Sequence, residues 1–349
     1  MEVPEWVSVR RSTASVILLK ANDIAFRVVC VALGVDFGGS RASWESRVRR
    51  MSPFLNLVLS VFAIPWCFWI IPELFQGHSF MPIVSTVSTF IFFGANFYAA
   101  LIFVHNREVI QSLLQSNSRQ SYDVILNLVC AVPVFVIMIG HLSSTSDVSE
   151  IVAQLFCSHS YFIMICFFAL YANLILDSTL RNQEILNYAR GTNRYSFDTL
   201  IAKWETRDRI GRMNSLFANL LSLYYVEFFV IFMQFFARLV ARDLSSTILA
   251  LMFFVLAGIT LPLLRLSRRC TYLISISVET EYVLSKRFLP DTPNYFELAV
   301  LRFREDFDVP MIGVFAHGIP NFLRFLSSSI TCTAVILQFD YTVLRRVSS

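Results

Sequence analysis

The sequence has few charged residues and no clustered cysteines. Only 15% of its 349 residues are charged, whereas a soluble domain normally carries about 25%. Hydrophobic residues make up 56%, and the 34 Phe residues outnumber the 29 basic ones. A soluble fold of this length has more surface than so few charges cover. The composition therefore excludes an ordinary soluble enzyme, a disordered chain and a nucleic-acid-binding protein, and it indicates an integral membrane protein.

Motifs for metal binding and catalysis are missing as well. None of the seven cysteines has a second one at a zinc-binding or redox spacing such as C-x-x-C. The apolar segments contain no HxxxH or DxxxD cluster. The sequence therefore predicts a protein that is not an enzyme and needs no metal or cofactor.

Seven apolar segments are long enough to cross a membrane as helices, which takes about 20 residues. They are predicted at 54–71, 79–104, 124–142, 151–176, 213–237, 244–264 and 311–339, so that 53–264 forms a bundle of six helices. The segment 12–33 carries Lys20, Asp23 and Arg27 on one helical face. We interpret it as an amphipathic helix within a cytoplasmic region 1–52, packed on the bundle or on the inner leaflet, and not as an eighth span.

Basic residues indicate the orientation of these spans. Of the 29 Lys and Arg residues, 24 lie in 1–52, 105–123, 177–213 and 265–310, and basic loops remain in the cytoplasm. Seven spans then place the N-terminus inside and the tail 340–349 outside. This orientation is opposite to that of G-protein-coupled receptors. The predicted fold class is an all-α membrane protein with seven transmembrane helices.

The loops differ in length between the two sides. The predicted external loops have about eight residues or fewer and no cysteine, so any small-molecule site must lie among the helices. The cytoplasmic segments 177–213 and 265–310 mix apolar and charged residues at helical spacing. We predict that they prolong the spanning helices into the cytoplasm. Those of 265–310 are expected to form anchor helices that dock with each other and with neighbouring subunits.

The last span ends in a pattern of small hydroxyl residues, aliphatic residues and a Gln–Phe pair. Thr331, Gln338 and Phe339 match the T-Y-x-x-x-x-x-Q-F signature of insect-type gustatory receptors and their invertebrate relatives, and Cys332 replaces the Tyr of the signature. The stretch from Glu279 to Phe325 also resembles the C-terminal third of that family. The resemblance covers the whole chain by architecture and about the last 70 residues by sequence.

The resemblance implies a ligand-gated, non-selective cation channel. It implies a homotetramer, or a heterotetramer with related receptors, in which the last helix of each subunit lines a central pore. The partners would be a small-molecule tastant or odorant, the permeant cations sodium, potassium and calcium, and the lipid bilayer, with no nucleic acid. The expected location is the plasma membrane of a sensory neuron, with a role in taste perception and sensory transduction.

Helical spacing supports a pore-lining face on the last span. Thr331, Val335, Gln338 and Phe339 fall on one face. Four copies would form an aliphatic ring that closes a narrow pore by dewetting, followed by rings of amides and aromatics. Alternatively, Thr331 and Gln338 bond to neighbouring helices. Arg324 lies two turns inward, and we interpret it as reaching the cytoplasmic interface by snorkelling.

Polar and aromatic residues in the outer half of the bundle are the candidates for a stimulus pocket. They are His141, Gln154, His159, Tyr161, Tyr224, Tyr225 and Glu227, with Gln234 as a further polar residue. Such a lining suits small apolar or hydroxylated molecules. Glu227, the only acidic residue in the first six spans, is either a partner of a ligand or proton, or a carboxyl kept neutral by its apolar site. The histidines could equally be core residues.

Three other classes of function are alternatives to a chemosensory channel. A sensor of light or heat could have the same fold. A metabotropic seven-helix receptor conflicts with the orientation. A transporter or membrane enzyme would require inverted repeats or paired broken helices, and the sequence has neither.

Overall fold

The computed structural model describes residues 13–35, 43–74, 80–114, 123–144, 148–191, 197–241, 246–288 and 319–347. Nearly all of these residues are helical, which confirms the predicted all-α class. The helices are α1 (Thr13–Leu33), α2 (Ser43–Leu74), α3 (Phe80–His105), α4 (Arg107–Leu114), α5 (Asp123–Ser144), α6 (Val148–Gly191), α7 (Phe197–Ala241), α8 (Ser246–Phe288) and α10 (Ile319–Val347).

Several helices are apolar enough to cross a bilayer. Within the described residues, four qualify by length and composition: Val87–His105 in α3, Gln154–Gly191 in α6, Ile201–Phe236 in α7 and Ile319–Gln338 in α10. Shorter apolar stretches lie in α2 and α5. Each of the seven predicted spans lies wholly or mostly within one helix, in the order α2, α3, α5, α6, α7, α8 and α10. Seven crossings and the orientation of the termini remain predictions.

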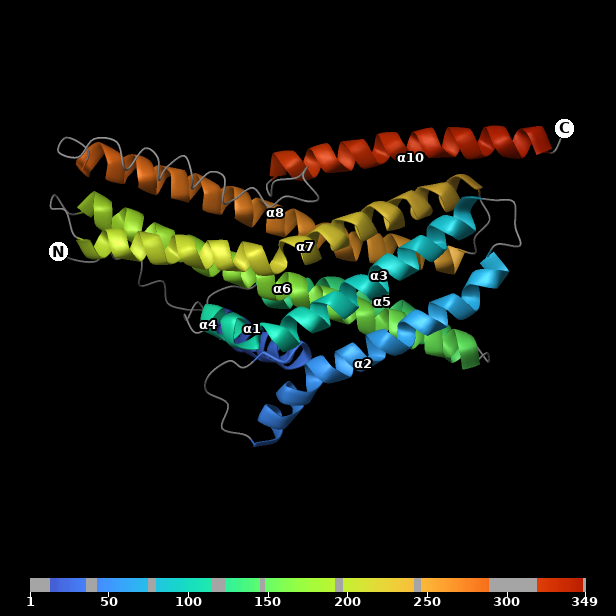
Figure 1. The fold of residues 1–349 in the computed structure, drawn as a ribbon, viewed down its shortest axis with the longest axis horizontal. Coiled ribbons are helices and arrows are strands. Elements are labelled where there is room, and N and C mark those ends of the chain that lie inside the picture. Colours follow the sequence, from blue (N-terminus) through green and yellow to red (C-terminus); the bar gives the residue numbers. More distant parts are fainter. Residues whose placement is uncertain are drawn as a thin grey trace.

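Three helices are much longer than a membrane is thick. α6, α7 and α8 contain 44, 45 and 43 residues. At a rise of 1.5 Å per residue each is about 65 Å long, whereas the hydrocarbon core of a bilayer is about 30 Å thick. The C-terminal ends of α6 and α8 and the N-terminal end of α7 project together on one side of the molecule (Figure 1). These projecting parts include the described residues of the predicted cytoplasmic segments 177–213 and 265–310.

An aromatic cluster forms the centre of the bundle. Phe167, Phe168 and Tyr171 of α6 pack against Phe217 and Tyr224 of α7, with ring centroids 5.4–5.7 Å apart. All five side chains are almost completely buried. The cluster holds α6 and α7 together at mid-length, so the polar groups around it keep fixed positions.

α1 packs against α2, α5 and α6. The Asn22 side chain accepts a hydrogen bond from the Ile125 amide at 3.2 Å. Ser52 and Asn56 of α2 both donate to the Ala32 carbonyl, at 2.6 and 2.9 Å. One face of α1 thus packs against the bundle, on α2, α5 and α6. On its other face Lys20, Ile24 and Arg27 are exposed, as an amphipathic helix requires.

α10 lies on the outside of the bundle, where it contacts α7 and α8 (Figure 1). It begins at Ile319, within the predicted last span, and continues to Val347, so most of the predicted tail 340–349 is helical. The segment 311–318 of the predicted last span, and residues 289–310 of the predicted anchor region, lie outside the described residues.

Candidate functional site

α10 has one face against the bundle and one face uncovered. Phe322, Phe325, Ser329 and Thr333 are buried, with exposed fractions of 7% or less. Their spacing of three to four residues places them along one side of the helix. At a turn of 100° per residue, Thr331 points in nearly the opposite direction. The two faces therefore have different neighbours and different chemistry.

Aromatic packing and one hydrogen bond attach the covered face. The Phe325 ring meets Tyr225 of α7 edge-on at 5.2 Å, and Phe228 packs on both Phe322 and Phe325. At the start of α10, the Ile319 amide donates to the Thr271 hydroxyl of α8 at 3.0 Å. The inner half of α10 is thus fixed to two helices that extend beyond the bundle.

The uncovered face contains the residues predicted to line a pore. Thr331, Val335 and Gln338 are exposed in the single chain, as are Arg324, Ser327, Ser328 and Cys332. The Thr331 hydroxyl donates to the Ser327 carbonyl of the same helix at 3.1 Å. The backbone of Phe339 is helical, and its side chain lies outside the described residues. The polar side chains lie along the middle of this face, and the apolar Leu323, Ile330 and Val335 are exposed beside them.

Tyr161 is buried between three helices. Its ring lies 5.9 Å from Phe135 of α5 in an edge-on arrangement, and 3% of the residue is exposed. Its hydroxyl lies 2.0 Å from where a Cβ on Gly258 of α8 would be. Only a glycine at position 258 leaves room for the Tyr161 hydroxyl. The hydroxyl has no hydrogen-bond partner among the described residues.

Tyr224 and Glu227 of α7 face α3. The Tyr224 hydroxyl donates to Asn96 Oδ1 at 3.2 Å. Ser88 donates to Glu227 Oε1 at 2.9 Å, and 2% of Glu227 is exposed. Both bonds link the same two helices, and their residues are eight apart on α3 and three apart on α7.

Tyr225 faces the opposite way, toward α8 and α10. Its hydroxyl lies 3.4 Å from the Ser267 hydroxyl of α8, and its ring contacts Phe325. The contacts of the predicted ligand-binding tyrosines and Glu227 therefore divide among three helix seams: α5–α6–α8, α3–α7 and α7–α8–α10.

The remaining predicted pocket residues lie toward the C-terminal end of α5 and in the first third of α6. His159 and Gln154 are half-buried, and His159 Nε2 has no hydrogen-bond partner among the described residues. Ser158 donates to the Gln154 carbonyl at 2.7 Å. His141 lies in α5, and its side chain is outside the described residues. The described part of the chain contains no group of His, Cys, Asp and Glu suited to a metal ion.

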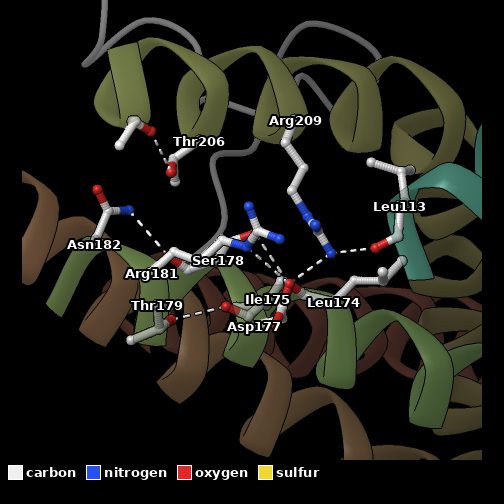
Figure 2. A network of polar contacts seen from close by, with 11 residues as sticks. Leu113, Leu174, Ile175, Asp177, Ser178, Thr179, Arg181, Asn182, Thr206 and Arg209 are labelled. Atoms are coloured by element: carbon white, nitrogen blue, oxygen red, sulfur yellow. Dashed lines mark hydrogen bonds and ion pairs between the residues drawn. The ribbon is translucent and has the colours of Figure 1, made fainter. Parts of the chain in front are cut away.

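A buried ion cluster joins the long helices near the start of their projecting parts (Figure 2). Asp177 of α6 accepts from Arg209 of α7 at 2.6 Å and from Arg181 at 3.4 Å. Arg209 also donates to the Leu113 carbonyl of α4. The side chains of Asp177 and Arg209 are only 8% and 11% exposed. Burial lowers the pKa of Arg209, and Asp177 opposes this shift.

A second buried ion pair lies further along the same helices. Lys203 of α7 donates to Asn182 of α6 and Ser277 of α8, both at 3.0 Å, and lies 3.8 Å from Glu281 of α8. Burial lowers the pKa of Lys203 and raises that of Glu281, while each charge opposes the shift of the other. One ammonium group thus connects all three helices.

Sequence reasoning missed the partners of these groups. Asn96, Ser88 and Gly258 lie in apolar runs. The polarity of the first two and the small size of the glycine distinguish them from the residues around them. Nothing in the sequence indicates that Arg209 of α7, among several basic residues of 177–213, reaches Asp177 of α6.

Two solved structures of the insect olfactory receptor OR5 from Machilis hrabei are similar to this chain. One aligns with a TM-score of 0.66 and 10% sequence identity over 96% of this chain and 100% of that chain. The other, in complex with eugenol, aligns with a TM-score of 0.61 and 12% identity over 98% of this chain and 100% of that chain. No family model and no curated protein sequence matches the chain. The likeness shows a shared fold over nearly the whole length.

Proposed function

We propose that the chain is a chemosensory receptor of the gustatory type that acts as a ligand-gated, non-selective cation channel. In the assembly, α10 of each subunit lines a central pore. The observation that carries the proposal is the two-faced packing of α10, with aromatic residues against the bundle and polar residues uncovered. The fold shared with an insect olfactory receptor supports the same function.

The chemistry of the uncovered face fits water better than lipid. Hydroxyl groups and a guanidinium in contact with hydrocarbon lose hydrogen bonds to water and raise the free energy. Thr331, Val335 and Gln338 lie along the middle and outer part of this face. When several copies meet around an axis, the hydroxyl and amide groups contact water and ions, and Val335 forms an apolar constriction.

The polar groups between the helices support a small-molecule stimulus. Tyr161 Oη and His159 Nε2, both on α6, are buried and have no hydrogen-bond partner among the described residues. Buried polar atoms are normally paired, so these atoms are available to a ligand. One of the similar olfactory receptor structures contains eugenol. We therefore propose a tastant or odorant that binds within the bundle of a multi-pass receptor in the plasma membrane of a sensory neuron.

Expression of the full chain in a cell without native receptors tests the proposal. Currents are recorded under sugars, bitter compounds, light and heat, with external sodium, potassium or calcium. Val335→Ala and Gln338→Ala should change rectification or ion selectivity. Ser329→Ala, on the covered face, should leave selectivity unchanged. Absence of any stimulated current, together with normal surface expression, would contradict the channel function.

The orientation and the stoichiometry have tests of their own. An epitope after Ser349 should be reached by antibody in intact cells, because the C-terminus is proposed to be extracellular. Mass photometry of the purified protein should give four copies per particle. A cytoplasmic epitope would overturn the topology, and a stable monomer would overturn the shared pore.

A further inference from the structure

Glu227 differs from the other buried acidic residues. Among the described residues three carboxyl side chains are buried, namely those of Asp177, Glu227 and Glu281. Asp177 and Glu281 each form an ion pair with a basic side chain. Glu227 forms none: Ser88 donates to its Oε1 at 2.9 Å, and its Oε2 has no hydrogen-bond partner in the described part of the chain.

A carboxylate in this position is unstable, because burial removes its hydration and no cation replaces it. A single hydroxyl donor satisfies only part of the hydrogen-bonding capacity of the charged form, which has two oxygens and about four lone pairs. A proton neutralises the group and needs no cavity to bind. The unpartnered Oε2 is the atom that receives it.

Within the part of the chain that the structure describes, no ion pair joins a charged side chain to Glu227, and its one hydrogen bond comes from a neutral group. The facing residue of α3 is the neutral Ser88. On α7 the nearest titratable side chain is Tyr224, whose hydroxyl donates to Asn96. The thiols of Cys166 on α6 and Cys270 on α8 lie near Tyr224 and Tyr225. α10 contributes the apolar Ile336 to the cluster one turn away.

The position of Glu227 connects it to the proposed pore helix. Three residues beyond Glu227, Val230 forms a buried cluster with Met233, and Ile91 of α3 and Ile336 of α10 pack against this cluster. Ile91 also lies three residues beyond Ser88. The Ser88–Glu227 bond and this cluster therefore both lie in the α3–α7 seam, within about one turn of each other on each helix. A change in this bond changes the surface on which α10 rests.

We propose that Glu227 and Ser88 form a proton-binding site in the α3–α7 seam. Protonation of Glu227 Oε2 neutralises the seam, and loss of the proton leaves a carboxylate that depends on Ser88 alone. Through the cluster of Val230 and Met233, against which Ile91 of α3 and Ile336 of α10 both pack, the protonation state biases the position of α10. The effect on current rests on the proposed channel function, whereas proton binding itself does not.

Infrared difference spectroscopy of the purified full chain in lipid nanodiscs measures the protonation directly. Titration from about pH 5 to about pH 9 should reveal a carboxylic C=O band that disappears as the pH rises. Glu227→Gln should remove this band. Ser88→Ala should move its midpoint up by about one pH unit, because the hydroxyl stabilises only the charged form strongly.

A matched control separates this site from general loosening of α7. Ser222 is buried on the same helix, and its hydroxyl bonds to the Ala218 carbonyl of that helix. Ser222→Ala should keep the midpoint of the wild type. The site is refuted if no titrating band depends on Glu227, or if Ser88→Ala leaves the midpoint unchanged.

Currents recorded over the same pH range test the link to α10. The wild-type response should change with pH around the infrared midpoint, and Glu227→Gln should abolish that change. A pH response in Glu227→Gln equal to the wild type would overturn the link. If no stimulus opens the channel while the Glu227 band still titrates, the proposed function fails and the proton site stands.

Discussion

The contact between Gly258 and Tyr161 gives a prediction whose magnitude follows from the structure. A Cβ at residue 258 would lie 2.0 Å from the Tyr161 hydroxyl oxygen, and Cβ atoms essentially never approach another atom within 3.0 Å. The Gly258→Ala change therefore forces the phenol to move by about 1 Å. The ring is held against Phe135 and is 3% exposed. Overpacking of this kind costs about 1–3 kcal/mol.

A second substitution isolates the cause. Alanine favours a helix over glycine by about 1 kcal/mol, so Gly258→Ala should destabilise the protein by roughly 0–2 kcal/mol net. In a Tyr161→Phe background the clashing oxygen is gone, and Gly258→Ala should be neutral or stabilising. Tyr161→Phe alone should cost nothing, because it removes a buried hydroxyl without a partner among the described residues.

Thermal or denaturant unfolding of all four proteins in the same detergent provides the measurement. The double-mutant cycle should give a coupling free energy of about 1–3 kcal/mol between the two positions. If Gly258→Ala destabilises the protein equally with and without the Tyr161 hydroxyl, the proposed close approach of α6 and α8 is wrong.

The buried ion pairs give two further predictions. Arg209→Ala leaves Asp177 buried without its close partner and should lower the free energy of unfolding by about 3–5 kcal/mol. The control Arg212→Ala breaks an exposed ion pair and should cost less than about 1 kcal/mol. Equal effects of the two substitutions would contradict the burial of the cluster. Lys203→Met should be strongly destabilising, and adding Glu281→Gln should recover most of the loss. Burial raises the pKa of Glu281, so between its ordinary and raised pKa the folded state holds a proton that the unfolded state has released. Stability should therefore fall as pH rises through that window, and this slope should be smaller in Glu281→Gln. Urea unfolding at several pH values measures both effects, and an unchanged slope would contradict the assignment.

The sequence predicted the features that depend on local pattern. Long charge-free runs predicted the apolar helices, since a helix in lipid must be apolar over its whole length. The three- and four-residue spacing predicted that Thr331, Val335 and Gln338 share a face, and all three are exposed on α10. The mixed apolar and charged segments predicted the prolonged helices, because only packing against one another buries their apolar faces.

Contacts between distant residues could not be predicted in this way. Ser88 and Glu227 are 139 residues apart, and Asn96 and Tyr224 are 128 apart. Which helices lie side by side depends on the packing of the whole bundle, and the apolar runs carry no register information. The division of the candidate pocket residues among three seams is for this reason visible only in the structure.

The most direct test of the central claim uses two threonines of α10. Thr331 is exposed on the uncovered face, whereas Thr333 is 3% exposed and faces the bundle. In a Cys332→Ser background, each is replaced by cysteine and treated with a charged, water-soluble thiol reagent during stimulation. Modification of Thr331→Cys should change the current, and the current of Thr333→Cys should be unaffected. Block at Thr333→Cys alone, or at neither residue, would contradict a pore lined by this face of α10.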